Sequence, residues 1–282
     1  MLWRGRRESE NVDDRRSFSG GHLVAGGGIV GVIIYLISLF MGGDSSLSQL
    51  QQQLPGTSQP MSAEEQAKDD ERAHFVKVVL AETEDIWTKI MGEQGRDYPK
   101  PVLVLFRDGV ESACGSASTA VGPFYCPGDQ HLYIDLSFFE ELQNRFHAPG
   151  DFPMAYVIAH EVGHHIQYLM GLSEKMDRLR SQLSEREFNR YSVKMELQAD
   201  FYAGVWAHYA AEIPDNLEPG DIEEALNAAN AIGDDKLQQE AQGRIVPDAF
   251  THGTSEQRMY WFKKGYDTGD IQQGNTFNDQ SL

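Results

Sequence analysis

The sequence has few cysteines and a deficit of basic residues. Only two cysteines, Cys114 and Cys126, occur in 282 residues, and 24 lysines and arginines stand against 43 acidic residues, for a formal net charge of −19. A nucleic-acid-binding protein needs a basic face, so we expect no nucleic acid as partner. The cysteines also lack the close spacing of a thiolate zinc site. In an oxidising compartment we expect them to form a disulfide.

Charge is absent from Leu23 to Gly42, a stretch of twenty residues. At about 1.5 Å per helical residue, this length spans a hydrocarbon core of about 30 Å. We therefore predict a retained transmembrane helix at residues 23–42. A cleaved signal peptide is the alternative, but it would have a shorter apolar core and a clearer small-residue cleavage site.

Basic residues are also absent between Arg16 and Lys68, whereas five arginines precede the apolar stretch. The positive-inside rule then predicts a cytoplasmic segment at residues 1–22 and export of the rest. Residues 43–62 are rich in Ser, Gln, Gly and Pro and are expected to form a flexible linker. We expect a single-pass protein of a bacterial inner membrane, with residues 63–282 as a periplasmic or extracellular domain.

The apolar stretch from Phe152 to Met170 contains the pattern His160-Glu161-Val162-Gly163-His164. Two histidines four residues apart share one helix face, where both imidazoles can bind one Zn²⁺, and the intervening glutamate can take a proton from water. Two hydrogen-bonded histidines and a solvated glutamate are the alternative. Because the helix is apolar nearly all round, we expect it to be buried, and buried ligating groups need partners. This favours the metal.

A third ligand does not come from the extended pattern H-E-x-x-H-x-x-G-x-x-H, because Gln167 and Met170 occupy its glycine and third-histidine positions. A glutamate on another helix is the other common source. The helix expected over residues 184–213 carries Glu196 and Asp200, four apart and flanked by apolar residues. We predict Glu196 as ligand and Asp200 as the acceptor for a ligand histidine's N–H. A solvated carboxylate pair is the alternative.

The C-terminal part offers two further candidates. His252 precedes a helix that Thr254 is expected to cap, and from this loop it can reach the site and stabilise an oxyanion. Arg258, one turn into that helix, can pair with an acidic residue of the ligand helix. Elsewhere we predict a helix from Ala63, a buried strand at 101–106, a loop at 107–130 and a strand at 131–136. As a hypothesis, this last strand aligns an extended peptide.

These ordered motifs resemble the bacterial putative neutral zinc metallopeptidase family over essentially the whole chain. The set comprises the segment WRGRRESENVDDRR at residues 3–16, the single apolar stretch, the HEVGH helix, Glu196-x-x-x-Asp200 and His252-Gly-Thr-Ser-x-Gln-Arg258. More distantly, the chain is similar to gluzincin membrane proteases of the Ste24 and HtpX kind. Those relatives usually have several membrane spans, and His-Pro where this chain has His252-Gly253.

The resemblance implies His160, His164 and Glu196 as ligands, Glu161 as base, Asp200 as partner of a ligand histidine and His252 as a transition-state donor. We expect an α+β, mainly helical, zincin-like domain with a small sheet, preceded by one transmembrane helix. Its predicted function is that of an endopeptidase with one Zn²⁺ per chain, acting on peptides or proteins of the cell envelope. A catalytically silent metal-bound scaffold, or a zinc amidase acting on cell-wall material, are the alternatives.

Overall fold

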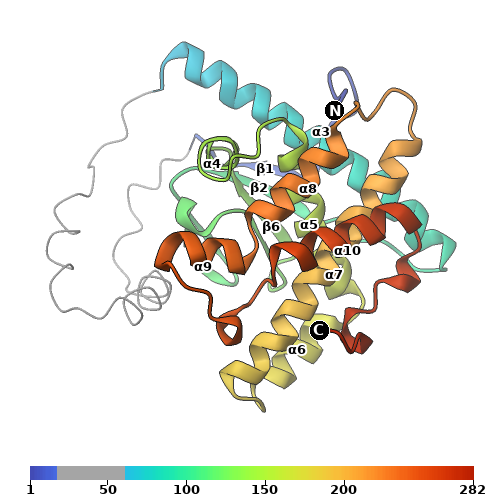
Figure 1. Ribbon diagram of the computed structural model, residues 1–282. Helices are drawn as coiled ribbons and strands as arrows, with labels where there is room; N and C mark the ends of the chain where they lie inside the picture. Colours follow the sequence, from blue (N-terminus) through green and yellow to red (C-terminus); the bar gives the residue numbers. More distant parts are fainter. Residues whose placement is uncertain (18–60) are drawn as a thin grey trace, which may run out of the picture.

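The computed structural model describes residues 1–17 and 61–282, which form a mainly helical α+β fold with a small sheet (Figure 1). The helices of the described residues are α3 (Ala63–Glu93), α4 (Phe138–Asn144), α5 (Phe152–Leu169), α6 (Leu172–Arg180), α7 (Glu185–Glu212), α8 (Asp221–Ala231), α9 (Asp234–Gln242) and α10 (Ser255–Thr268). The strands are β1 (Val12–Asp14), β2 (Val102–Phe106), β3 (Gly109–Ser112), β4 (Gly115–Ser118), β5 (Phe124–Cys126) and β6 (His131–Asp135).

The main sheet has the order β1-β2-β6-β5, with parallel β1–β2 and β2–β6 pairs and an antiparallel β5–β6 pair. The central strands β2 and β6 are apolar on both faces, because both faces are covered. Leu103 and Leu132 point into the large core shared with the helices. Val104 and Tyr133 instead join a smaller cluster with Val110 of the β3–β4 hairpin.

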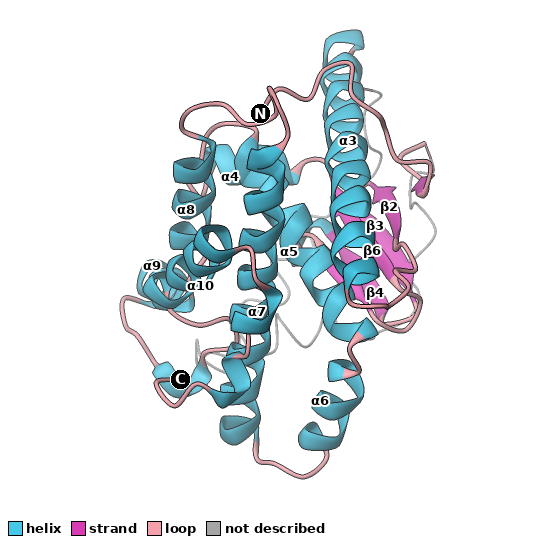
Figure 2. Ribbon diagram, turned by 90° about the vertical axis from the view of Figure 1, so that its right-hand side faces the viewer, coloured by secondary structure: helices cyan, strands magenta, loops and turns pink. Residues whose placement is uncertain are grey.

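Helix α5 lies at the centre of the fold. Figure 2 shows the sheet and α3 on one side of it, and α7, α8 and α10 on the other. Its apolar residues are buried all round, as the sequence predicted. Pro153 lies in its first turn and left-handed Gly171 follows its end. Asp151 stands at the N-cap position, but its side chain accepts no hydrogen bond from the first turn and instead accepts one from the Met1 ammonium.

Helix α7 begins with a capping box at Ser184 and Glu187 and ends at Glu212, close to the predicted bounds. It crosses α5 at Gly163, inside the HEVGH motif. A Cβ at Gly163 would lie 3.0 Å from the Ala199 carbonyl oxygen, closer than nearly all Cβ contacts. The glycine therefore permits the close approach that brings the histidine face of α5 against α7.

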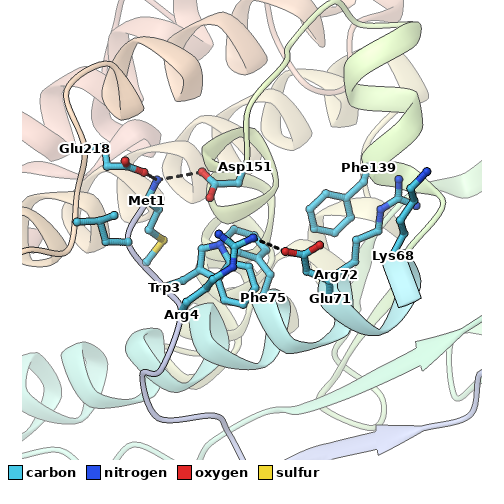
Figure 3. Close-up of a pocket in the computed structure, with 11 residues that line it drawn as sticks. Met1, Trp3, Arg4, Lys68, Glu71, Arg72, Phe75, Phe139, Asp151 and Glu218 are labelled. Carbon is cyan, nitrogen blue, oxygen red and sulfur yellow. Dashed lines mark hydrogen bonds and ion pairs between the residues drawn. The ribbon is translucent and has the colours of Figure 1, made fainter. Parts of the chain in front are cut away.

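Residues 1–17, here called the N-terminal strap, are held by ionic contacts. The Met1 ammonium contacts Asp151, Glu218 and Asp221 at 2.8–3.1 Å, and Figure 3 shows it beside the first two. The strap's other contacts are Arg4 with Glu71, Arg7 with Glu84 and Asp85, Ser9 and Asn11 with Glu84, and Arg16 with Asp69. The strap also contributes β1, which pairs with β2 as an edge strand of the main sheet.

The strap corrects the predicted organisation. Residues 1–22 were expected in the cytoplasm, apart from the domain, yet β1 pairs with β2 inside the domain's own sheet. The transmembrane helix is not supported either: among residues 1–17 and 61–282 no helix is both long and apolar enough to cross a bilayer. Residues 23–42, to which that prediction applied, and most of the linker at 43–62 lie outside the described residues.

The predicted loop at 107–130 was also wrong, because it contains β3, β4 and β5. These strands are three or four residues long, and β3 and β4 are rich in Gly and Ser, so the segment shows no hydrophobic alternation. Strand β6 corresponds to the predicted strand at 131–136, but it pairs with β2 on one side and β5 on the other. Its edges are therefore closed to an added peptide strand, and the hypothesis that it aligns substrate is wrong.

Candidate metal centre

Three nitrogen and oxygen atoms converge between α5 and α7. His160 Nε2 lies 3.1 Å from Glu196 Oε2, and His164 Nε2 lies 3.5 Å from the same oxygen. Ligands of a tetrahedral zinc, at about 2.0–2.2 Å from the metal, are separated by about 3.3–3.6 Å. The ligand atoms of this trio all lie within 4.8 Å of one another, so the set fits one Zn²⁺ with a position left for water.

The remaining ring nitrogens of the histidines are held by hydrogen bonds. His160 Nδ1 donates to Asp200 at 2.8 Å, and His164 Nδ1 donates to the Gln167 amide oxygen at 2.9 Å. Gln167 in turn donates to the Met195 carbonyl of α7. These contacts direct both Nε2 atoms towards Glu196, which is how neighbouring acceptors orient metal-binding histidines. Gln167 occupies the position where the extended motif would have glycine.

Asp200 is fully buried and makes three kinds of contact. It accepts two bonds from Arg258, at 2.8 and 2.9 Å, and one from the Tyr156 hydroxyl at 2.6 Å, besides the bond from His160. Burial raises the pKa of Asp200, but Arg258 and His160 outweigh burial and hold it well below its ordinary value. The carboxylate is therefore charged and can polarise the imidazole of His160.

Glu161 lies beside the three converging atoms and is itself buried. Burial raises the pKa of its carboxyl above the ordinary value, against the effect of His164 and His160. A carboxylate with a raised pKa next to a candidate metal is suited to accept and return a proton.

His252 and Arg258 reach the site from the C-terminal part. His252 lines the same cleft as His160 and Glu161, with half of its side chain exposed. Burial lowers the pKa of His252, but Glu196 and Asp234 outweigh it and raise the pKa. A protonated imidazole there is suited to stabilise negative charge. Helix α10 begins with the predicted Thr254 cap and carries Arg258 to Asp200.

Asp234, at the start of α9, was not identified from the sequence. Its Oδ2 accepts backbone N–H bonds from Thr251, His252 and Gly253 at 2.6–3.0 Å, and its Oδ1 lies 3.4 Å from His252 Nδ1. Gly253 has a φ of +93°, which proline cannot adopt. The departure from His-Pro thus has a local cause. A sequence cue for Asp234 was the Gly-Asp-Asp run at 233–235, which is typical of a helix start.

The cleft in front of these residues has a volume of about 550 Å³. Beyond the polar residues already described, its walls are mostly apolar, from α4, α5, α9 and the segment before β5. The apolar wall residues include Val121, Phe124, Phe138, Phe146, Val157, Ile232 and Leu237. β5 borders the cleft and is an edge strand, because β6 pairs with only one of its sides.

The two cysteines form a disulfide next to this strand. Cys126 ends β5 and is fully buried, and it is bonded to Cys114 in the β3–β4 turn. His165 is likewise buried and takes no part in the converging trio. It instead bonds to Tyr125 of β5 at 3.0 Å.

A buried H-E-x-x-H helix packed against a Glu-x-x-x-Asp helix beside a cleft is the kind of site that zinc-dependent peptidases use. The comparison with known families agrees. The chain belongs to the family described as "Putative neutral zinc metallopeptidase", which matches residues 1–277. The family therefore implies zinc, and its name suggests a peptidase.

Similar chains occur in distant bacteria. "Uncharacterized protein YpfJ" of Escherichia coli strain K12 is 48% identical over 286 residues, covering 98% of this chain and 99% of its own. "Uncharacterized protein Rv2575" of Mycobacterium tuberculosis strain H37Rv is 44% identical over 195 residues, covering 66% of this chain and 65% of its own. No solved structure matches the chain.

Proposed function

We propose that the protein is a zinc-dependent endopeptidase in which His160, His164 and Glu196 hold one Zn²⁺. The observation that carries this proposal is the convergence of two imidazole Nε2 atoms on one carboxylate oxygen, 3.1 and 3.5 Å away. The orientation of the histidines by Asp200 and Gln167 supports it. A zinc ion bound there supplies Lewis acidity and lowers the pKa of water.

The chain's own groups then perform the proton transfers. Glu161, as general base, takes a proton from the attacking water and delivers it to the amine of the leaving group. His252, protonated and held by Asp234, donates to the oxygen that becomes negative as water adds to the scissile carbonyl. Asp200 and Arg258 keep His160 in one orientation throughout.

The substrate proposed is an extended stretch of peptide or protein. β5 is an edge strand whose residues Phe124 and Tyr125 line the cleft. An edge strand suits main-chain hydrogen bonding to a peptide. Apolar walls suit the side chains of unfolded protein segments. The Cys114–Cys126 disulfide supports an oxidising compartment, and we therefore propose that the substrate is met in the cell envelope.

The test is cleavage of a mixed peptide library by the purified full chain, analysed by mass spectrometry. We expect cleavage that chelation abolishes and added Zn²⁺ restores. Glu161→Gln should keep zinc but lower kcat by about 10²–10⁴-fold. The matched control is Glu174→Gln, on the exposed face of α6, which should leave kcat unchanged.

Two results would redirect the proposal. A zinc-loaded chain that binds peptides without cleaving any would indicate a catalytically silent binding protein. Hydrolysis of purified peptidoglycan, with unfolded protein left intact in the same reaction, would indicate an amidase acting on cell-wall material.

A further inference from the structure

Tyr125 of β5 connects the cleft to a buried residue of α5. It lines the same cleft as Glu161. Its hydroxyl bonds to the ring of His165, with an oxygen–nitrogen distance of 3.0 Å. A displacement of Tyr125 would therefore change the wall of the cleft that contains the proposed general base.

His165 is built into the fold to hold that hydroxyl. It is fully buried on α5, directly after His164. Its Nε2 lies 2.7 Å from the Pro99 carbonyl oxygen, which can only accept, so Nε2 donates and Nδ1 accepts from Tyr125. The ring is packed edge-on by Tyr98 and stacked by Tyr168. The imidazole has no rotational freedom to exchange these two partners.

The His165–Tyr125 hydrogen bond, here called the clamp, acts on a short edge strand. β5 has only three residues, pairs with a single strand, and lines the cleft through Phe124 and Tyr125. Main-chain hydrogen bonds to β6 fix the position of β5 within the sheet, but the distance between β5 and α5 depends on other contacts. The His165–Tyr125 bond supplies that contact from the helix, one residue before the disulfide-bonded Cys126.

We propose that His165 and Tyr125 are positioning residues, which fix the edge strand β5 at the height above α5 that catalysis requires. The proposal rests on the proposed peptidase function for its kinetic consequence, and on the geometry alone for its structural one. Neither side chain contributes an atom to the ligand trio, so loss of the clamp should alter the reaction without releasing zinc.

The experiment compares Tyr125→Phe, His165→Leu and His165→Gln in the full chain. Tyr125→Phe removes only the hydroxyl, and His165→Leu removes both bonds. Glutamine retains one donor and one acceptor, so His165→Gln should restore part of what leucine loses. The matched control is Tyr168→Phe, because Tyr168 belongs to the same aromatic cluster but its hydroxyl lies outside this chain of hydrogen bonds.

Two measurements are made on each variant. Amide hydrogen exchange in residues 121–126 should become about tenfold faster in Tyr125→Phe, as expected for one lost hydrogen bond. With a cleaved peptide, kcat should fall about tenfold at constant zinc content, with KM changing much less. Tyr168→Phe should match the wild type in both measurements.

The proposal is overturned if Tyr125→Phe exchanges and turns over like the wild type, or if Tyr168→Phe shows the same losses. Should His165→Leu fail to fold, Tyr125→Phe still decides the outcome. If the wild-type chain cleaves nothing, the peptidase proposal fails, yet the exchange rates still show whether the clamp holds β5.

Discussion

The candidate metal centre and the N-terminal strap are two clusters of charge that differ in how their buried carboxylates are neutralised. At the strap, Glu84 is 1% exposed and is met by Arg7, Ser9, Asn11 and Lys100. At the metal centre, Asp200 is matched in the same way by Arg258. Among the described residues, however, the ion-pair contacts of Glu196 are to imidazole nitrogens, which are groups that commonly bind metals.

This difference separates a structural cluster from a functional one. Burying a carboxylate is costly unless hydrogen bonds and opposite charge compensate for it. Where the chain supplies every partner, the cluster stabilises the fold. Where the neighbours are metal-binding groups, the cluster is suited to bind a cation. Changes in the two clusters should therefore separate activity from stability.

The largest effect is expected at Glu196. Glu196→Ala removes one of three ligands, so zinc binding and hydrolysis should both be lost. Elemental analysis of the purified chain after dialysis gives the zinc content directly. A variant that still holds one zinc per chain would refute the ligand assignment and with it the contrast drawn here.

Asp234→Asn should have an intermediate effect on activity. The amide can still accept backbone bonds at the 251–253 turn, but it no longer favours the protonated form of His252. We expect kcat to fall about 10–100-fold with zinc content unchanged. Asp235→Asn, the adjacent residue, serves as control. Equal losses in the two variants would mean that Asp234 only maintains the turn.

Glu84→Gln tests the strap. A neutral side chain keeps some hydrogen bonds but leaves Arg7 and Lys100 without their shared counter-charge. We expect the free energy of unfolding to drop by about 2–3 kcal/mol, measured in urea, with zinc binding and kcat unchanged. A matching loss of activity would show that the strap is coupled to the site, and the two clusters would no longer be separable.

At Glu82 we expect an effect on stability that depends on pH. Glu82 is 8% exposed, its Oε1 has no hydrogen-bond partner among the described residues, and burial raises its pKa to about 7. The folded chain then holds this proton more tightly than the unfolded chain does. Ionisation of Glu82 therefore destabilises the folded chain. This destabilisation is absent below about pH 4.5, grows as the pH rises to about 7, and stays constant above that pH.

Glu82→Gln should accordingly be more stable than the wild type by about 3 kcal/mol at pH 8 and equal to it at pH 4. Urea titrations at the two pH values measure this difference. A constant offset at both values would show that the carboxyl does not titrate as described.

The parts of the site that local spacing encodes could be predicted from the sequence. His160, His164, Glu196 and Asp200 lie four apart in pairs on helices, and helical periodicity fixes each pair on one face. The partners that come from elsewhere could not. Tyr125 lies in a strand of three residues without alternation, and Asp234 is eighteen positions before His252.

The arginines of the strap were misinterpreted for a related reason. A rule that counts basic residues near an apolar stretch takes no account of what they contact. In the structure, Arg7 and Arg16 are bound by acidic residues of α3, and Arg4 contacts Glu71 on the same helix. Three of the five arginines that were counted towards a membrane signal thus form ion pairs within the fold.

The pairing of strand β1 with β2 restricts the compartments in which the two ends of the chain can lie. Three residues of the strap, Val12 to Asp14, are in register with Leu103 to Leu105 of β2. Hydrogen-bonded neighbours in one sheet share one aqueous phase. A reporter fused before Met1 and one fused after Leu282 must therefore report the same compartment, whichever compartment that is.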